Sequence, residues 1–256
     1  MVLSCGQIRL RLFEKNLNYN MWSYYGTKTS SVDFYPPPKH DVLIEPFAGA
    51  AKYALKYFEK EVIILDRYPL IVDIWKWLQK CSPADVLKLP SVKYGEHVDA
   101  YSYDCKEARD LIGFMVGFST SYPRRTGTIR MKQRPNYINY QLKSIASQLF
   151  KIKHWDIRQG TYSDIYNRKA TWFIDPPYQG KGGNKYKFGT KTIDYEKLAK
   201  WCISRKGQTI VCDSKGADYL PFKFFKNSVG SRGIFTEMIW SNEIIASDNE
   251  QLKLIL

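Results

Sequence analysis

The chain has 256 residues, of which 44% are hydrophobic, and it carries a formal net charge of +14. This length is enough to bury one sizeable core with a small appended lobe. The longest apolar runs, at residues 62–65 and 111–118, are far shorter than the ~20 residues of a membrane span, and a signal peptide is also not expected. We therefore expect an intracellular protein, and the excess of cations fits either a nucleic-acid partner or a solvated basic surface.

The cysteines and histidines show no metal-ligand spacing. Structural zinc sites use pairs of these residues a few positions apart. We therefore expect reduced thiols and no bound metal. The residues concerned are Cys5, Cys81, Cys105, Cys202, Cys212, His40, His97 and His154.

Residues 41–79 alternate between strand and helix patterns. Three consecutive prolines at 36–38 mark a stiff connection before them. Such alternation predicts a parallel sheet covered by helices. In chain order the predicted elements are a strand at 42–44, a turn at 46–49, a helix at 50–59, a strand at 62–65 and a helix at 70–79.

Residues 82–154 lose this alternation and gain tyrosines and a basic stretch. Strand patterns then resume at 171–174, 209–212 and 238–240. Because both ends of the chain supply strands, we expect one main domain, made of residues 1–81 and 155–256, with residues 82–154 as an inserted lobe. The basic stretch contains Arg124, Arg125, Arg130, Lys132 and Arg134.

The strongest chemical signal follows the predicted strand at 171–174, where the chain continues as Asp175, Pro176, Pro177 and Tyr178. A proline cannot continue a central strand, so the chain leaves the sheet and presents Asp175 at the crevice formed by the strand ends. The carboxylate and the Pro176 carbonyl suit the two hydrogens of an exocyclic amine, with Tyr178 stacked on the base. The alternative is an ordinary turn with a solvated acid.

A second signal follows the strand at 42–44. The turn formed by Glu45, Pro46, Phe47, Ala48 and Gly49 has small residues that let a ligand approach the backbone. It lacks the G-x-G-x-x-G spacing of a dinucleotide site, which disfavours a nicotinamide cofactor. Asp66 ends the next strand, where an acid commonly accepts hydrogen bonds from a ribose diol, and a charge at a helix N-terminus is the alternative.

These motifs, in this order, resemble the deoxyadenosine methylase (Dam-like) group of DNA adenine-N6 methyltransferases. That group has a lysine-bearing motif, a cofactor-binding strand and turn, a target-recognition insertion and then D-P-P-Y. Residues 24–28 are similar to its W-x-G-G-K element, with Thr27 in place of the second glycine, and residues 45–49 to its E-P-F-x-G element. Residues 160–162 are similar to its G-D-F turn, with Thr161 in place of the acid, and residues 236–242 to a late strand motif.

The resemblance implies an α/β, Rossmann-like S-adenosyl-L-methionine-dependent methyltransferase fold, with a mostly parallel sheet, helices on both faces and a target-recognition lobe. It implies a monomer in the cytoplasm of a bacterial cell or phage-infected host, with double-stranded DNA contacted by the five basic residues of the lobe. Catalysis would belong to Asp175, Pro176, Pro177 and Tyr178. The implied cofactor-binding residues are Tyr24, Lys28, Glu45, Phe47, Ala48, Gly49, Asp66, Thr161, Tyr162 and Asp175.

Several alternatives stay open at this point. The same four catalytic residues could methylate the exocyclic amine of cytosine, because that amine poses the same chemical problem. An RNA adenine methylase and a catalytically silent nucleic-acid-binding module are the other two alternatives. The glycine-rich residues 179–185 fit either a loop that closes over a flipped nucleotide or a plain surface loop.

Overall fold

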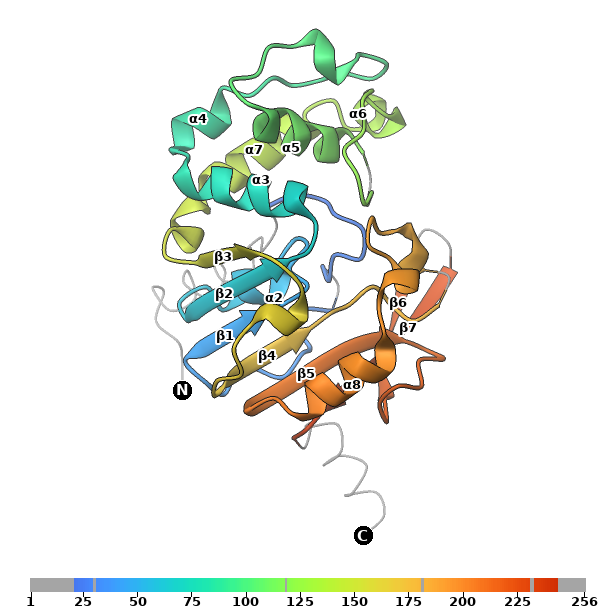
Figure 1. Ribbon diagram of the computed structural model, residues 1–256. Helices are drawn as coiled ribbons and strands as arrows, with labels where there is room; N and C mark the ends of the chain where they lie inside the picture. The colour runs from blue at the N-terminus through green and yellow to red at the C-terminus, as the bar shows by residue number, and fades with distance from the viewer. Residues whose placement is uncertain (1–20, 30, 118, 181, 231–232, 244–256) are drawn as a thin grey trace, which may run out of the picture.

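The computed structural model describes residues 21–29, 31–117, 119–180, 182–230 and 233–243. Cys5, and the part of the predicted main domain before residue 21, lie outside these ranges. The described residues form one seven-stranded sheet with the strand order β3-β2-β1-β4-β5-β7-β6 (Figure 1). The strands are β1 (Val42–Glu45), β2 (Glu61–Asp66), β3 (Asp156–Gln159), β4 (Ala170–Ile174), β5 (Gly207–Ser214), β6 (Lys223–Gly230) and β7 (Gly233–Ser241).

The sheet is mostly parallel. β1 pairs in parallel with β2 and β4, and the parallel pairing continues outward to β3 on one side and β5 on the other. β7 is antiparallel to both β5 and β6. The chain moves outward from β1 to β3 and then returns to β4 on the other side of β1, so the strand order reverses between β1 and β4. The predicted α/β class is confirmed, and the order from β3 to β5 is consistent with a Rossmann-like fold.

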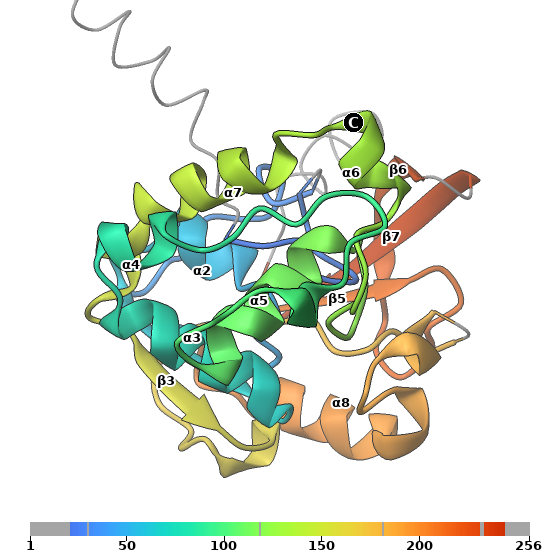
Figure 2. The ribbon, with the colours of Figure 1, turned by 90° about the horizontal axis from the view of Figure 1, so that it is seen from above.

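Helices cover both faces of the sheet. α3 packs on β2 and β3, α5 packs on α3, and α4 packs on α7, whereas α8 packs on β5 (Figures 1 and 2). Leu43 and Phe173 belong to the core on the α3 side, and Ile44 and Trp172 to the core on the α8 side, as the period of two in a strand requires. The helices are α2 (Lys52–Lys56), α3 (Pro69–Lys80), α4 (Pro83–Leu87), α5 (Lys106–Val116), α6 (Ile129–Gln133), α7 (Tyr137–Ala146) and α8 (Tyr195–Ile203).

The helix predicted at 50–59 is shorter than expected, since α2 covers only Lys52–Lys56. Gly49 and Ala51 both have left-handed backbones, with φ of 46° and 44°, which a right-handed helix cannot include. The predicted helix at 70–79 and the five predicted strands are present. β3 and β6 were not predicted from the sequence.

Residues 83–146 contribute α4, α5, α6 and α7 between α3 and β3, at the position of the predicted insertion. Their buried side chains, among them Ile112 and Leu142, join the same apolar core as the α3 side of the sheet. Among the described residues, no helix is long and apolar enough to cross a membrane. Nor do those residues include a group of three or more histidines, cysteines or acids placed to hold a metal ion.

Candidate active site

A pocket lies over the carboxyl ends of four neighbouring parallel strands. β1 ends in Glu45, β2 ends in Asp66, β4 is followed by Asp175, and β3 is followed by the turn that holds Thr161. The empty space of the pocket, including the part open to solvent, is about 930 Å³. This is the switch point of the strand order, where open α/β sheets bind their ligands. All ten predicted cofactor-binding residues line this pocket: Tyr24, Lys28, Glu45, Phe47, Ala48, Gly49, Asp66, Thr161, Tyr162 and Asp175.

The turn after β1 is fixed by Asp66. One carboxylate oxygen of Asp66 accepts a hydrogen bond from the Gly49 amide at 2.9 Å, and the other accepts from the Tyr68 amide at 2.8 Å. A Cβ atom on Gly49 would lie 3.1 Å from the Tyr24 ring, in addition to the strain of its positive φ. Asp66 therefore holds both the glycine turn and the start of α3, and each oxygen keeps a further lone pair.

Two aromatic rings stand at the β3 end of the pocket. Phe47 and Tyr162 are stacked, with ring centroids 5.7 Å apart and an interplanar angle of 28°. The hydroxyl of the adjacent Thr161 donates a hydrogen bond to Asp164 at 2.9 Å, and its amide donates to the same oxygen at 2.7 Å. The sequence therefore has a carboxylate three residues after the position where the resemblance expects an acid.

The lysine-bearing motif closes the pocket from the opposite side. The Thr27 hydroxyl donates to the Tyr24 carbonyl at 2.5 Å and accepts from the Tyr24 amide at 3.2 Å, so Thr27 closes the turn where the resemblance expects a glycine. Gly26 has a φ of 76°, and a Cβ atom there would lie 2.0 Å from the Tyr186 hydroxyl. That hydroxyl donates to the Tyr25 carbonyl at 3.1 Å.

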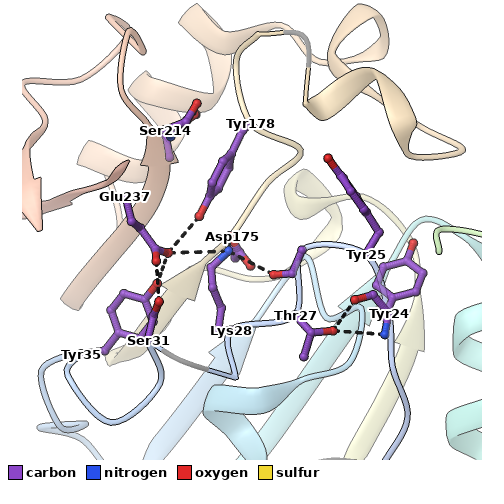
Figure 3. Close-up of polar contacts among 12 residues, drawn as sticks. Tyr24, Tyr25, Thr27, Lys28, Ser31, Tyr35, Asp175, Tyr178, Ser214 and Glu237 are labelled. Atoms are coloured by element: carbon purple, nitrogen blue, oxygen red, sulfur yellow. Dashed lines mark hydrogen bonds and ion pairs between the residues drawn. The ribbon is translucent and has the colours of Figure 1, made fainter. Parts of the chain in front are cut away.

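Lys28 links this motif to the predicted catalytic residues. Its Nζ lies 2.6 Å from Asp175 Oδ1 and 4.5 Å from the centroid of the Tyr178 ring (Figure 3). Both side chains of the ion pair are largely buried. Of the other two predicted catalytic residues, Pro177 lines the pocket and its carbonyl accepts a hydrogen bond from the Tyr195 hydroxyl, while Pro176 is buried.

A second buried acid, Glu237 on β7, was not predicted as a site residue. It lies 3.7 Å from Lys28 Nζ and accepts hydrogen bonds from the hydroxyls of Tyr178 at 3.0 Å and Ser31 at 2.6 Å (Figure 3). The Tyr35 hydroxyl donates to it as well. The sequence contained one signal for Glu237: it is an acid within the apolar strand pattern of residues 236–240. Charged residues are rare on buried strand faces, so an acid there indicates a special role.

Burial shifts the pKa of the charged groups in this cluster. It raises the pKa of Asp175 to about 6, although the Lys28 ammonium opposes the rise. Burial acts to lower the pKa of Lys28, but attraction to Asp175 and Glu237 outweighs it and leaves that pKa above its usual value. Burial acts to raise the pKa of Glu237, but Lys28 and three hydroxyl donors hold it below its usual value.

Two other acidic or basic side chains of the pocket differ from this cluster. Burial raises the pKa of Glu45 well above its usual value, although Glu45 accepts a hydrogen bond from the Ala54 amide at 3.0 Å. Lys52, which was not predicted as a site residue, lines the pocket while only 5% exposed. Burial lowers the pKa of Lys52 to about 8. Among the described residues that line the pocket, the salt bridge is therefore the one between Lys28 and Asp175.

The predicted nucleic-acid-binding residues lie outside the pocket. Arg124, Arg125, Lys132 and Arg134 are exposed, whereas Arg130 is partly buried. Several of these cations lie over tyrosine rings: Arg124 over Tyr122, Arg130 over Tyr137 and Lys132 over Tyr94.

The loop before these cations contacts two parts of the site. The Tyr25 amide donates to the Thr120 carbonyl at 3.1 Å, and the Ser121 hydroxyl donates to the Lys185 carbonyl. The loop that precedes the basic stretch is thereby attached to Tyr25, which lines the pocket, and to Lys185.

The glycine-rich segment 179–185 is anchored at both ends, with Lys181 outside the described residues. The Gln179 amide donates to the Asp213 carboxylate at 3.1 Å, and residues Gly183–Lys185 form a 3-10 turn. A Cβ atom on Gly183 would lie 2.1 Å from the Tyr178 carbonyl, so this glycine allows the segment to pass close to the catalytic motif. A loop that closes over a nucleotide and a plain surface loop both stay predictions for this segment.

No protein-family model matches the chain, and the search of curated proteins finds no relative of it.

Proposed function

We propose that this protein transfers a methyl group from S-adenosyl-L-methionine to the exocyclic amine of adenine in DNA. One observation carries the proposal: the Asp175 carboxylate lies at the end of β4, on the border between the pocket and the Tyr178 ring. The reaction needs an acceptor at that border, because the amine has to meet the methyl donor while its hydrogens are held.

The pocket lining fits S-adenosyl-L-methionine. The Phe47 and Tyr162 rings offer flat faces for an adenine ring, and Asp66 keeps lone pairs for ribose hydroxyls. Glu45 offers a carboxyl group for the amino group of the methionine part. Gly49 lets the Tyr24 ring pack against the turn, since a Cβ on Gly49 would lie 3.1 Å from that ring. When bound, this cofactor would supply a methyl group activated by a sulfonium.

The catalytic residues then act on the amine itself. The ionised Asp175 carboxylate and the Pro176 carbonyl accept its two hydrogens, which draws the lone pair back onto the nitrogen. Tyr178 offers a ring face to the base, and its hydroxyl is fixed by Glu237 at 3.0 Å. A base reaches such a buried site only after it leaves the duplex stack.

The exposed cations that follow the loop at Thr120 and Ser121 support a polyanionic substrate. Arginine and lysine side chains that contact phosphates release counterions and fix the position of a nucleic acid without selecting its sequence. The net charge of +14 is in keeping with this role. DNA, and adenine within it, are favoured by the motif resemblance.

The test is mass spectrometry of nucleosides from duplex DNA and from RNA after incubation with S-adenosyl-L-methionine and the wild type or Asp175→Ala. We expect N6-methyladenine in DNA with the wild type and none with the variant. N4-methylcytosine in DNA would keep the mechanism and change the target, and methylated adenine in RNA alone would change the polymer. No methylated base in either polymer would favour a silent binding module.

A further inference from the structure

The structure points to a role for Glu237, which lies on β7 and is 2% exposed. Three hydroxyl donors converge on its carboxylate, from Ser31, Tyr35 and Tyr178. A buried carboxylate with several donors keeps its charge, whereas one without them becomes neutral. Glu237 is therefore a fixed negative charge that also holds the hydroxyl end of the Tyr178 ring.

The Lys28 ammonium contacts the two groups that the proposed reaction assigns to the target amine. It is 2.6 Å from Asp175 Oδ1 and 4.5 Å from the centre of the Tyr178 ring (Figure 3). In the proposed reaction the amine makes the same two contacts, a hydrogen bond to Asp175 and a place beside the Tyr178 ring. If the amine takes the place over the Tyr178 ring beside Asp175 Oδ1, the ammonium has to move away from Asp175 when the base enters, and we expect this displacement.

We propose that Glu237 is a positioning residue of this site, which fixes Tyr178 and takes over the Lys28 ammonium from Asp175 when the target amine arrives. This inference rests on the proposed function. Glu237 already lies 3.7 Å from Lys28 Nζ, so a small movement of the lysine completes the exchange. Without such a partner, a buried ammonium displaced from Asp175 would be strongly unfavourable.

The other charged groups around Asp175 are less suited to receive the ammonium. Asp213 already accepts hydrogen bonds from the Gln179 amide at 3.1 Å and the Tyr219 hydroxyl at 3.0 Å. Glu45 accepts a hydrogen bond from the Ala54 amide at 3.0 Å, and burial raises its pKa well above the usual value, which disfavours the charged form. Cys212 also adjoins the cluster, and burial raises the pKa of its thiol, which stays neutral. Glu237 is thus the ionised acceptor closest in geometry.

The first experiment needs no substrate. Carbon-13 NMR would follow the titration of the Asp175 carboxyl in the wild type, in Glu237→Gln and in the control Glu61→Gln, whose exposed carboxylate pairs with Arg168. In Glu237→Gln the amide can still accept from Tyr178 and donate to Ser31, but the charge is gone. We expect the Asp175 titration to move to lower pH, because a neighbouring negative charge is lost and Lys28 pairs with Asp175 alone. An unmoved titration would overturn the inference.

The second experiment is a double-mutant cycle on DNA methylation. We expect Glu237→Gln to lower kcat/KM by about tenfold, the change for losing one hydrogen bond or contact to a charged group. In a Lys28→Met background the same substitution should cost much less, since no ammonium remains to be received. Binding of S-adenosylhomocysteine by calorimetry should be unchanged by Glu237→Gln, because Glu237 is not part of the pocket lining.

Equal costs of Glu237→Gln in both backgrounds would reduce Glu237 to a structural residue and overturn the inference. A wild type that methylates no polymer would instead overturn the proposed function, while the carboxyl titration would still show whether Asp175 and Glu237 share Lys28. If Glu237→Gln does not fold, Glu237→Asp serves in its place. Glu237→Asp keeps the negative charge but moves it away from Lys28 by the length of one methylene group. We therefore expect the same changes in the Asp175 titration and in kcat/KM, each smaller than in Glu237→Gln.

Discussion

The cluster around Asp175 and the basic stretch at residues 124–134 use charge in opposite ways. In the cluster, Lys28, Asp175 and Glu237 are largely buried, and Lys28 Nζ lies within 4 Å of both carboxylates. In the basic stretch, Arg124 and Arg125 are exposed. Buried charges interact strongly and depend on exact distances, whereas exposed charges are screened by solvent and salt. The methyl-transfer rate should therefore respond strongly to the change of a single atom in the cluster. DNA binding should depend on how many charges the basic stretch carries.

The largest effect is expected at the centre of the cluster. Asp175→Asn keeps the shape of the side chain but removes the charge that accepts the amine hydrogens. We expect the rate of the methyl-transfer step to fall by about 10²–10³-fold, as when one preorganised polar group is removed from an active site. Single-turnover methylation of duplex DNA measures this rate. The salt dependence of DNA binding should not change, and a changed salt dependence would break the division between the two regions.

The pH dependence of the reaction tests the same carboxylate. Because burial raises the pKa of Asp175 to about 6, the acceptor is ionised above that pH and protonated below it. We expect kcat/KM, which reports the unliganded protein, to be level above pH 7 and to fall about tenfold per pH unit below 6. A profile that stays level down to pH 4.5 would contradict an essential ionised Asp175. Denaturation is excluded by circular dichroism at each pH.

Substitution of Gly26 in the lysine-bearing motif measures how much space the pocket wall leaves beside Tyr186. Gly26→Ala adds a Cβ atom 2.0 Å from the Tyr186 hydroxyl at a residue with a φ of 76°. We expect the free energy of unfolding to fall by more than the roughly 1–3 kcal/mol that a strained left-handed residue costs by itself, because the Cβ also clashes with Tyr186, and cofactor affinity to fall with it. Denaturant unfolding and calorimetry measure the two quantities. Gly95→Ala is the matched control, since Gly95 has a φ of 80° but open space around it.

The smallest effects are expected in the basic stretch. Arg124→Ala and Arg125→Ala should each weaken DNA binding several-fold and reduce the slope of log affinity against log salt concentration by about 1. Fluorescence anisotropy of a labelled duplex at several salt concentrations measures the slope. Arg168→Ala, which removes an exposed arginine paired with Glu61, is the control and should leave the slope unchanged. Equal slopes for all three variants would remove Arg124 and Arg125 from the interface.

Sequence patterns predicted the parts of the site that follow strands. Glu45, Asp66 and Asp175 lie at the ends of three separate predicted strands, and the parallel arrangement brings them to one edge, whereas Thr161 was identified only by the resemblance. The resemblance added Tyr24 and Lys28, which no local pattern would have placed in a pocket. The roles of these residues in binding and catalysis stay predictions.

Other features depend on contacts that no local pattern contains. Glu237 joins the cluster only because β7 pairs with β5, and Ser31 and Tyr35 meet it across more than 200 residues of chain. The short α2 was missed because alanine normally favours a helix, whereas Ala51 is left-handed. β3 was missed because three of its four residues are exposed at that end of the sheet, which leaves little apolar pattern to detect.

The hydrogen bond between Ser31 and Glu237 also has a consequence for biosynthesis. The two residues are 206 positions apart, so at about 5–20 residues per second the ribosome adds Glu237 about 10–40 s after Ser31. Asp175 is added 62 residues before Glu237, so at this rate Lys28 and Asp175 are both present without their shared acid for about 3–12 s, and the edge of β5 that β7 covers is unpaired once β5 has been made. A nascent chain can thus fold much of its cofactor pocket early, but it completes the catalytic cluster only when the last described strand has been made.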